Sequence, residues 1–349
     1  MSSKGFFIDS LDGIRAVAFL IVFIAHCGAE KVIPGGFGVT IFFFLSGYLI
    51  TTLLRLEFEK ANTISLKKFY LRRVFRIFPL QYLALAIGYG LVFLTIIPGK
   101  PTLVSALMQF FQLTNYLTMH GTEIVPYGTG IFWSLSVEEH FYLAFPLVFM
   151  FLVKRYSYST IAFSFLSLCA LILFWRMILM VDMPDQIERI YRGTDTRIDS
   201  ILFGCVLAMF QNPKLDKTTF SVPICLLACG CSVVVLAFTF LYKDSFFRET
   251  YRYTLQGIAL FPIFYTAIRF PNWWCYRILN IPIIKYFGIL TFAMYLFHFM
   301  IIYIIETYIP IDFWVIRTLI TLAITFLLAH VLHLVIEKPL LEVRKKMQI

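Results

Sequence analysis

The chain has 349 residues, of which 60% are hydrophobic and 14% are charged, with a formal net charge of +10. Its mean hydropathy is +0.82. Soluble domains carry about a quarter charged residues and less than about half apolar ones, so this composition excludes a soluble enzyme, a disordered chain and a disulfide scaffold. The apolar residues occur in runs of about 17–25, the length that a helix needs to cross a bilayer. The sequence therefore predicts a polytopic membrane protein.

The cysteines agree with this class. There are seven, several of them inside apolar runs, and no CxxC pair or zinc-ligand spacing occurs. An odd number without such spacing argues against a disulfide framework. We therefore expect small buried thiols and no metal site.

The apolar stretches predict an all-α bundle of about ten transmembrane helices in a single domain over residues 8–340. A short basic cytoplasmic tail over residues 341–349 is expected to follow. No internal repeat is visible, and no connection is long enough to fold alone. The predicted spans cover residues 10–30, 36–55, 76–97, 131–153, 160–180, 198–211, 219–241, 253–270, 283–305 and 313–336.

The basic residues predict the orientation of these spans. Lysine and arginine cluster at alternate connections, whereas the opposite connections hold fewer cations, interleaved with acids. Because cytoplasmic loops carry an excess of Lys and Arg, both termini are predicted to be cytoplasmic. The net positive charge is then a topology signal, and no nucleic-acid partner is expected. The basic clusters lie at 55–76, 154–155, 214–217, 269–285 and 338–346.

Arg15 and His26 lie within the first predicted span. They are 11 residues apart, so at about 100° per residue they share one face of a regular helix, about 16 Å apart along its axis. Ionisable side chains inside a bilayer are costly and mark candidate functional sites. A histidine that serves only as a buried hydrogen-bonding group is the structural alternative for His26.

Three arginines, Arg72, Arg73 and Arg76, stand at the start of the third predicted span. Guanidinium groups suit bidentate contacts with phosphate oxygens. This cluster therefore predicts a cytoplasmic site for a coenzyme with several phosphates. The alternative is anchoring at the membrane surface by snorkelling, which we predict for Lys67 and Lys68.

Two adjacent carboxylates, Glu138 and Glu139, lie in the fourth predicted span, about 10 Å below its outer boundary. We expect His26 at a comparable depth. A carboxylate that binds an imidazole fixes its tautomer and stabilises the imidazolium during proton transfer, so one glutamate is predicted to face His26. The alternative is a structural ion pair with Arg176 or Arg317.

Two further pairs of polar residues are weaker candidates. Arg197 and Asp199 begin the sixth predicted span, where an interhelical salt bridge is the alternative. Tyr295 and His298 lie in the outer half of the ninth.

Other polar or small residues in the spans favour structural roles. His330 and His333 lie near the inner end of the tenth span, where we predict packing. Ser46 and Gly47 are explained by close helix packing through small residues.

Taken together, these segments resemble acyltransferase family 3, a family of integral membrane O-acyltransferases. The resemblance extends over residues 11–340, and its motifs occur in order on the predicted spans. The matching segments are Leu11–Ala16 with His26, Gly36–Val39, Phe44–Ile50, Arg73–Pro79, Trp133–Leu135, Glu138–Tyr142, Arg197–Ser200 with Gly204, Tyr295–His298 and Glu337–Pro339.

The resemblance implies transfer of an acyl group, usually acetyl from cytosolic acetyl-coenzyme A, to a hydroxyl of a cell-envelope glycan or a lipid-linked sugar. The family's essential histidine maps onto His26 and its first-span arginine onto Arg15. Its arginine pair maps onto Arg73 and Arg76, and its acidic element onto Glu138–Glu139. Some members carry an extra periplasmic hydrolase-like domain, which we do not expect here. The acceptor is then expected to come to the membrane, unless a separate periplasmic protein accepts the acyl group.

The resulting hypothesis is an O-acetyltransferase in the inner (plasma) membrane, with acyl-coenzyme A as a donor substrate and no permanently bound cofactor. Arg15, Arg72, Arg73 and Arg76 would hold the coenzyme phosphates. His26 would act either as general base or as a transient acyl carrier, oriented by a glutamate. Five further residues are predicted to contact the substrate or to hold the site in shape: Trp133, Arg197, Asp199, Tyr295 and His298.

Two other functions compete with this reading. A secondary transporter or exporter of a sugar or anionic metabolite could use the same polar residues as a pathway, but it predicts related halves with broken helices. A membrane sensor or scaffold is the third candidate, and no soluble ligand-binding domain supports it. Release of coenzyme A that depends on an added acceptor would separate the enzyme from both.

Overall fold

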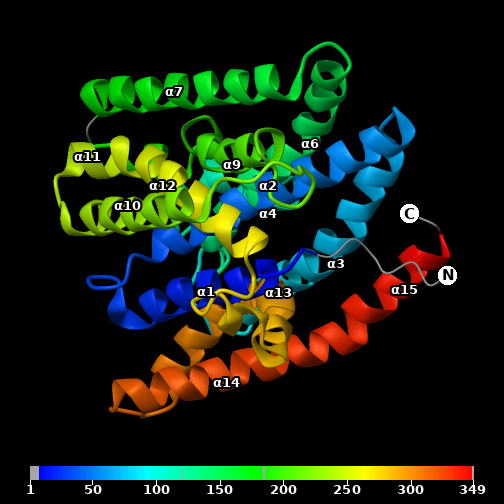
Figure 1. Ribbon diagram of the computed structural model, residues 1–349. Coiled ribbons are helices and arrows are strands. Elements are labelled where there is room, and N and C mark those ends of the chain that lie inside the picture. The colour runs from blue at the N-terminus through cyan, green and yellow to red at the C-terminus, as the bar shows by residue number, and fades with distance from the viewer. Residues whose placement is uncertain (1–7, 120, 184, 348–349) are drawn as a thin grey trace.

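The computed structural model describes residues 8–119, 121–183 and 185–347. This part of the chain forms helices and no strand, which confirms the predicted all-α membrane bundle (Figure 1). The first half contains α1 (Leu11–Ile24), a π-helical turn (Ala25–Ala29), α2 (Gly35–Ala61), α3 (Leu66–Phe93), α4 (Leu103–Phe110), α5 (Thr114–Thr118), a 3-10 turn (Gly130–Phe132), α6 (Trp133–Val153) and α7 (Tyr158–Asp182).

The second half of the chain completes the bundle. It contains α8 (Ile187–Arg192), α9 (Thr194–Met209), α10 (Val222–Leu241), α11 (Ser245–Glu249), α12 (Tyr251–Arg269), a 3-10 turn (Arg277–Asn280), α13 (Pro282–Tyr308), α14 (Trp314–Leu332), a π-helical turn (His333–Glu337) and α15 (Lys338–Lys346). Each of the ten predicted spans overlaps one of the long helices.

Among the described residues, eight helices are long and apolar enough to cross a membrane. The two predicted spans that fall short are α9 and α12. Helix α9 has 16 residues, and nearly all of them are buried. Because protein rather than lipid surrounds α9, its length does not have to match the hydrocarbon thickness.

Helices α2 and α9 cross at the centre of the bundle (Figure 1). A Cβ atom at Gly47 would lie 1.9 Å from the carbonyl oxygen of Ile201, and one at Gly204 would lie 2.0 Å from that of Phe44. The two backbones therefore touch where both helices have glycine, which is the close packing expected of small residues in membranes.

Helices α7, α10 and α14 lie at the periphery of the bundle. Their outward faces carry many exposed large apolar side chains. The described part of the chain thus has the apolar surface of a multi-pass membrane protein.

Helix α3 begins ten residues before the predicted span at 76–97. The side chain of Ser65 caps it by accepting a hydrogen bond from the backbone N–H of Lys68 at 3.4 Å. The apolar pattern misses these first turns because they are basic. The three arginines at 72–76 are consequently inside the helix.

Helix α1 does not continue regularly through His26. It ends at Ile24 and passes into the π-helical turn, in which Cys27 and Gly28 leave helical geometry and Gly28 has a φ of 98°. A side chain rarely adopts this φ, so glycine suits the position. The dihedral angles leave the helical region only after His26, at Cys27 and Gly28, so the shared helix face of Arg15 and His26 stays a prediction.

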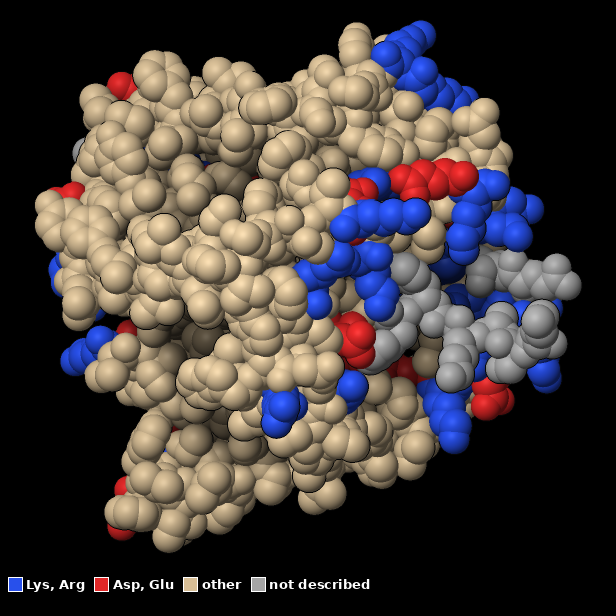
Figure 2. All heavy atoms as spheres, viewed as in Figure 1, with Lys and Arg blue, Asp and Glu red and all other residues tan. Residues whose placement is uncertain are grey.

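Lysine and arginine side chains gather at one end of the molecule, where α2 ends, α3 begins and α15 lies (Figure 2). We call this the basic end. Residues 341–346 of the predicted tail belong to α15, which contacts α3. Residues 348–349 of that tail lie outside the described residues.

Candidate active site

Three of the pockets formed by the described residues contain the predicted site residues. The basic pocket, of about 760 Å³, includes Arg72 and Arg344. The carboxylate pocket, of about 110 Å³, includes Glu138 and Glu139. The histidine pocket, of about 350 Å³, includes His26. We keep these three names below.

The basic pocket holds a large excess of positive charge. Seven cationic side chains line it against two acidic ones. Asp12 pairs with Arg15 at 2.6 Å and Glu57 with Arg72 at 3.2 Å, so each acid is already engaged. The seven cations are Arg15, Lys60, Lys68, Arg72, Arg73, Arg76 and Arg344.

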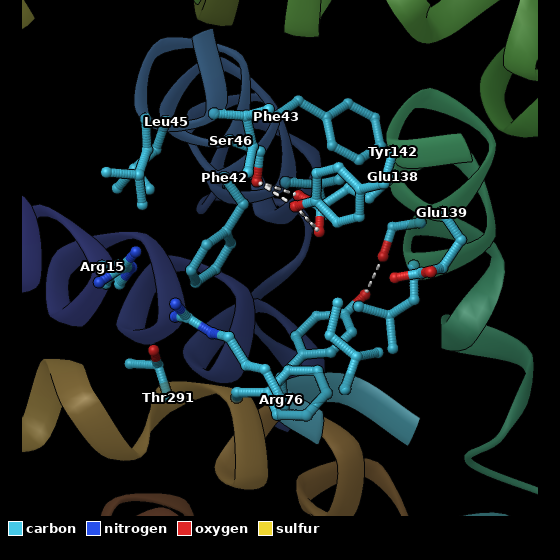
Figure 3. A pocket seen from close by; sticks show the side chains of 18 of the residues that line it. Arg15, Phe42, Phe43, Leu45, Ser46, Arg76, Glu138, Glu139, Tyr142 and Thr291 are labelled. Carbon is cyan, nitrogen blue, oxygen red and sulfur yellow. Dashed lines mark hydrogen bonds between the residues drawn. The ribbon is translucent and has the colours of Figure 1, made fainter. Parts of the chain in front are cut away.

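The basic pocket leads into the carboxylate pocket through shared walls. Arg15, Arg73 and Arg76 line both. Figure 3 shows Arg15 on α1 and Arg76 on α3 directed toward one another across the entrance. The Nε atom of Arg73 is buried without a hydrogen-bond partner in the described structure. A buried guanidinium with an N–H group that has no partner can donate a hydrogen bond to an anion or to another acceptor oxygen.

Glu138 belongs to a compact hydrogen-bonded group in the carboxylate pocket (Figure 3). Ser46 Oγ donates to Glu138 Oε1 at 2.7 Å, and the Tyr142 hydroxyl lies 3.3 Å from Oε2 and 3.1 Å from Ser46 Oγ. Glu139 lines the same pocket, and no hydrogen bond of its side chain is found in the described structure. Ser46 therefore has a polar role besides the packing role predicted from its motif.

His26 is bound by a second histidine. Its Nδ1 lies 2.9 Å from Nε2 of His298, whose own Nδ1 lies 2.8 Å from the backbone oxygen of Tyr295. A carbonyl oxygen only accepts, so Nδ1 of His298 carries a proton. When both rings are neutral, Nε2 of His298 then accepts from Nδ1–H of His26. This leaves the lone pair of His26 on Nε2.

The predicted contact between His26 and a glutamate is not found in the described residues. His298 occupies the place expected for the carboxylate, and Glu138 binds Ser46 and Tyr142 instead. Nor does any one of the three pockets formed by the described residues contain Arg15, His26 and the glutamates together. Within the described structure, the carboxylate and histidine pockets share no lining residue.

A thin layer of side chains separates these two pockets. Tyr295 lines the carboxylate pocket, and its hydroxyl lies 2.8 Å from Ser134 Oγ. His298, fully buried, lies between Tyr295 and His26. Elsewhere in the layer the ring of Trp133 packs on Tyr191, with centroids 4.9 Å apart. Three of the predicted support residues, Trp133, Tyr295 and His298, thus lie in the wall between the pockets.

Arg197 is a fully buried cation in the same wall. It donates to the backbone oxygen of Tyr191 and to Thr40 Oγ1, both at 3.2 Å. Its guanidinium lies over the ring of Tyr253, 4.0 Å from the centroid. No carboxylate pairs with it among the described residues, and its Nε has no partner. The predicted salt bridge is therefore absent for Arg197.

The buried carboxylate of Asp199 pairs with a different arginine. Arg176 Nη1 on α7 lies 2.7 Å from Asp199 Oδ2 on α9, and both side chains are fully buried. The salt-bridge alternative is thus correct for Asp199. The alternative pairing of the glutamates with Arg176 or Arg317 is wrong, because Arg317 pairs with Glu306 at 3.4 Å.

The two histidines of the last span have structural partners, as predicted. Nδ1 of His330 lies 2.6 Å from the Tyr286 hydroxyl, and Nδ1 of His333 lies 2.7 Å from Glu337. Arg344, which was not predicted as a site residue, reaches the basic pocket from α15. Because Arg344 lies in a basic cluster near the C-terminus, the sequence indicated only a role in the orientation of the spans.

Comparison with known proteins agrees with the motifs. The sequence matches the acyltransferase domain family over residues 8–334. It is 30% identical to the O-acetyltransferase OatA of Staphylococcus aureus strain NCTC 8325 / PS 47, over 97% of this chain and 58% of that protein. The same values hold for OatA of strain COL, so the chain spans little more than half the length of these relatives. No solved structure matches it. Because the family match covers almost the whole chain, the protein belongs to the acyltransferase domain family, acyltransferase family 3.

Proposed function

We propose that the protein is a membrane O-acetyltransferase that uses acyl-coenzyme A, in the first place acetyl-coenzyme A, as donor. The acceptor is a hydroxyl of a cell-envelope glycan or a lipid-linked sugar. The observation that carries the proposal is the continuity of the basic pocket with the carboxylate pocket through Arg15, Arg73 and Arg76. The names of the relatives, O-acetyltransferases, supply the type of transfer.

The basic end is the cytoplasmic end in this proposal. The gathering of Lys and Arg there supports that orientation, and it would put both termini in the cytoplasm of a cell whose plasma membrane holds the protein. The coenzyme then enters from the cytosol, and its phosphates bind the arginines of the basic pocket, including Arg72 and Arg344. The pantetheine arm extends into the carboxylate pocket.

The transfer requires the side chains between the two pockets to move apart, so that the thioester meets the acceptor hydroxyl beside His26. The acceptor oxygen then bonds to the carbonyl carbon of the thioester as the bond from that carbon to sulfur breaks. Nε2 of His26 takes the hydroxyl proton, and the departing thiolate takes up a proton to leave as free coenzyme A. Alternatively, the same nitrogen carries the acyl group from donor to acceptor. Both roles use the lone pair that the hydrogen bond to His298 leaves on Nε2.

The two glutamates act in the donor pocket rather than on His26 in this proposal. Glu138 holds Ser46 and Tyr142 in place, and Glu139 is the carboxylate without a protein hydrogen bond in the described structure. They line the same pocket as the arginines that approach from α1 and α3. Arg197, buried in the wall, is the candidate group to stabilise the charge that develops on the carbonyl oxygen.

The test uses the purified protein in proteoliposomes with acetyl-coenzyme A outside or inside and an envelope glycan fraction as acceptor. We expect free coenzyme A and acetylated glycan to form in equal amounts, and only when the acceptor is present. Movement of sugar across the bilayer with no loss of acetyl-coenzyme A would refute the enzyme and favour the transporter.

Replacing Arg76 by Gln is expected to raise the KM for acetyl-coenzyme A about 10-fold or more with little change in kcat, because a charge-assisted hydrogen bond contributes about 1.5–3 kcal/mol. Acetyl-pantetheine, which lacks the nucleotide phosphates, should be used equally by the variant and the parent. The measurement is the initial rate of thiol release with each donor.

Arg155→Gln is the matched control for this prediction, since Arg155 lies outside the pocket and over the ring of Phe151. It should leave both KM values unchanged. An equal loss with both donors in Arg76→Gln would show that this arginine does not bind the nucleotide.

Replacing His298 by Leu is expected to lower kcat about 10–100-fold, the usual effect of losing a group that orients a functional imidazole. His298→Gln should recover much of the loss, because its amide oxygen can accept from His26 and its amide N–H can donate to Tyr295. Initial rates at saturating acetyl-coenzyme A give the comparison. Equal rates in both variants would mean that His298 only fills space.

A further inference from the structure

The histidine pocket carries more positive charge than its acids can neutralise. Its cations are Lys31, Lys243, Arg248 and Arg252, and its acids are Glu30, Glu188 and Glu249. Two of the acids are engaged elsewhere. Glu188 pairs with Arg192 at 2.5 Å, and Glu249 accepts from the Tyr253 hydroxyl at 2.7 Å and pairs with Arg252 at 3.5 Å.

Three of these cations have no carboxylate partner in the described part of the chain. They come from separate segments: Lys31 follows the turn that bears His26, Lys243 follows α10, and Arg248 lies in α11. All three line the pocket that also contains His26. Glu30 is the only carboxylate of the pocket, among the described residues, that is not held by an arginine or a tyrosine.

The floor of the pocket adds donors that no protein group uses. The Nε of Arg252 is buried without a partner in the described structure, although its Nη2 donates to the Tyr253 hydroxyl at 3.0 Å. Behind the floor, Arg197 underlies both Tyr191 and Tyr253. A buried cation without a counter-ion raises the potential of the nearby pocket, because little solvent screens it.

The remaining lining is suited to a sugar ring. Tyr191, Tyr253, Phe37 and Phe240 offer aromatic faces, and Gln256 offers an amide. Pockets that combine apolar and aromatic walls with a few polar groups hold and orient small ligands. His26 lies at the edge of this lining, so an acceptor hydroxyl in the pocket is next to the imidazole.

We infer that the histidine pocket is the acceptor site and that its acceptor is anionic, a hydroxyl-bearing sugar that carries a carboxylate or phosphate group. The inference rests on the proposed function and narrows its acceptor. The anionic group pairs with Lys31, Lys243 and Arg248, and the sugar places a hydroxyl at His26. The hydroxyl loses its proton to His26 and gains the acyl group, while coenzyme A leaves as the free thiol.

Three matched acceptors test this inference: a neutral methyl hexoside, the corresponding methyl hexuronide and the corresponding hexoside phosphate. Each is given to the protein in proteoliposomes with acetyl-coenzyme A, and acetylated product is measured by mass spectrometry. We expect one or both anionic acceptors to have a KM at least about 10-fold below that of the neutral one. Preference for the hexuronide identifies a carboxylate, and preference for the phosphate identifies a phosphate.

In the double variant Lys243→Gln with Arg248→Gln, the KM for the neutral acceptor divided by the KM for the anionic acceptor is expected to fall about 10-fold. Added salt should reduce the same ratio in the parent protein. Lys100→Gln is the matched control, because Lys100 lies outside the pocket. The KM for acetyl-coenzyme A should be unchanged in all three proteins, which shows that the variants are folded.

Equal KM values for all acceptors, unaffected by the double variant, would overturn the anionic acceptor and leave the acetyltransferase in place. Absence of product and of free coenzyme A with every acceptor, the native glycan fraction included, would overturn the proposed function itself.

Discussion

Replacing His26 by Gln is expected to lower the rate of acetyl transfer about 10²–10⁴-fold, the range that a positioned general base contributes. Glutamine still bonds to His298, so the wall between the pockets stays packed, but it has no nitrogen that can take up a proton or an acyl group. The measurement is acceptor-dependent release of coenzyme A from membranes that contain equal amounts of each protein.

His330→Gln is the control, since that ring is bonded to the Tyr286 hydroxyl and lines none of the three pockets. It should keep the parental rate. A His26→Gln protein that acetylates at the parental rate would exclude both roles proposed for the imidazole. Acetyl bound to the parent protein in the absence of acceptor, and absent from the variant, would favour the carrier role over the base.

The replacement Arg176→Met should cause the largest loss of stability in the molecule, about 3–5 kcal/mol, because it leaves the carboxylate of Asp199 buried and uncompensated. Arg176 also donates to the backbone oxygen of Thr196 and to Thr254 Oγ1, both at 2.6 Å, so α7, α9 and α12 would all lose a contact. Thermal unfolding of the purified protein in detergent measures the effect.

The double variant Arg176→Met with Asp199→Leu separates the charge from the contacts. Replacing both partners by apolar groups removes the buried charge, so most of the lost stability should return. If the double variant is less stable than Arg176→Met alone, the carboxylate contributes through its other hydrogen bonds, such as the one from the N–H of Ser200 at 2.8 Å.

The membrane fold could be predicted because a long apolar run of residues can adopt few structures inside a bilayer. Every backbone group in hydrocarbon must be paired, which leaves helices as the structure for such runs. The ends of the helices were less predictable where polar residues continue a helix. At the start of α3, basic residues such as Lys67 and Arg72 interrupt the apolar pattern, so the first ten residues of the helix were not predicted. The predicted span at 198–211 overlaps the buried helix α9, but the central position of that helix depends on contacts that no local pattern encodes.

The candidate residues of the site were identified from the sequence, but not their partners. The cost of charge in a bilayer singles out Arg15, His26 and Glu138 without a structure. The bond from His26 to His298 joins residues 272 positions apart. Pairing across such distances depends on tertiary packing.

The separation of the carboxylate and histidine pockets also has a consequence for the ion gradients across the membrane. A continuous aqueous channel past the imidazole would let protons and small ions leak across. Tyr295, His298 and Trp133 lie between the two pockets. In the proposed function, only the acyl group would have to pass this wall. The coenzyme would then stay on the cytoplasmic side, and a modification on the other side would draw on internal metabolism without depolarising the cell.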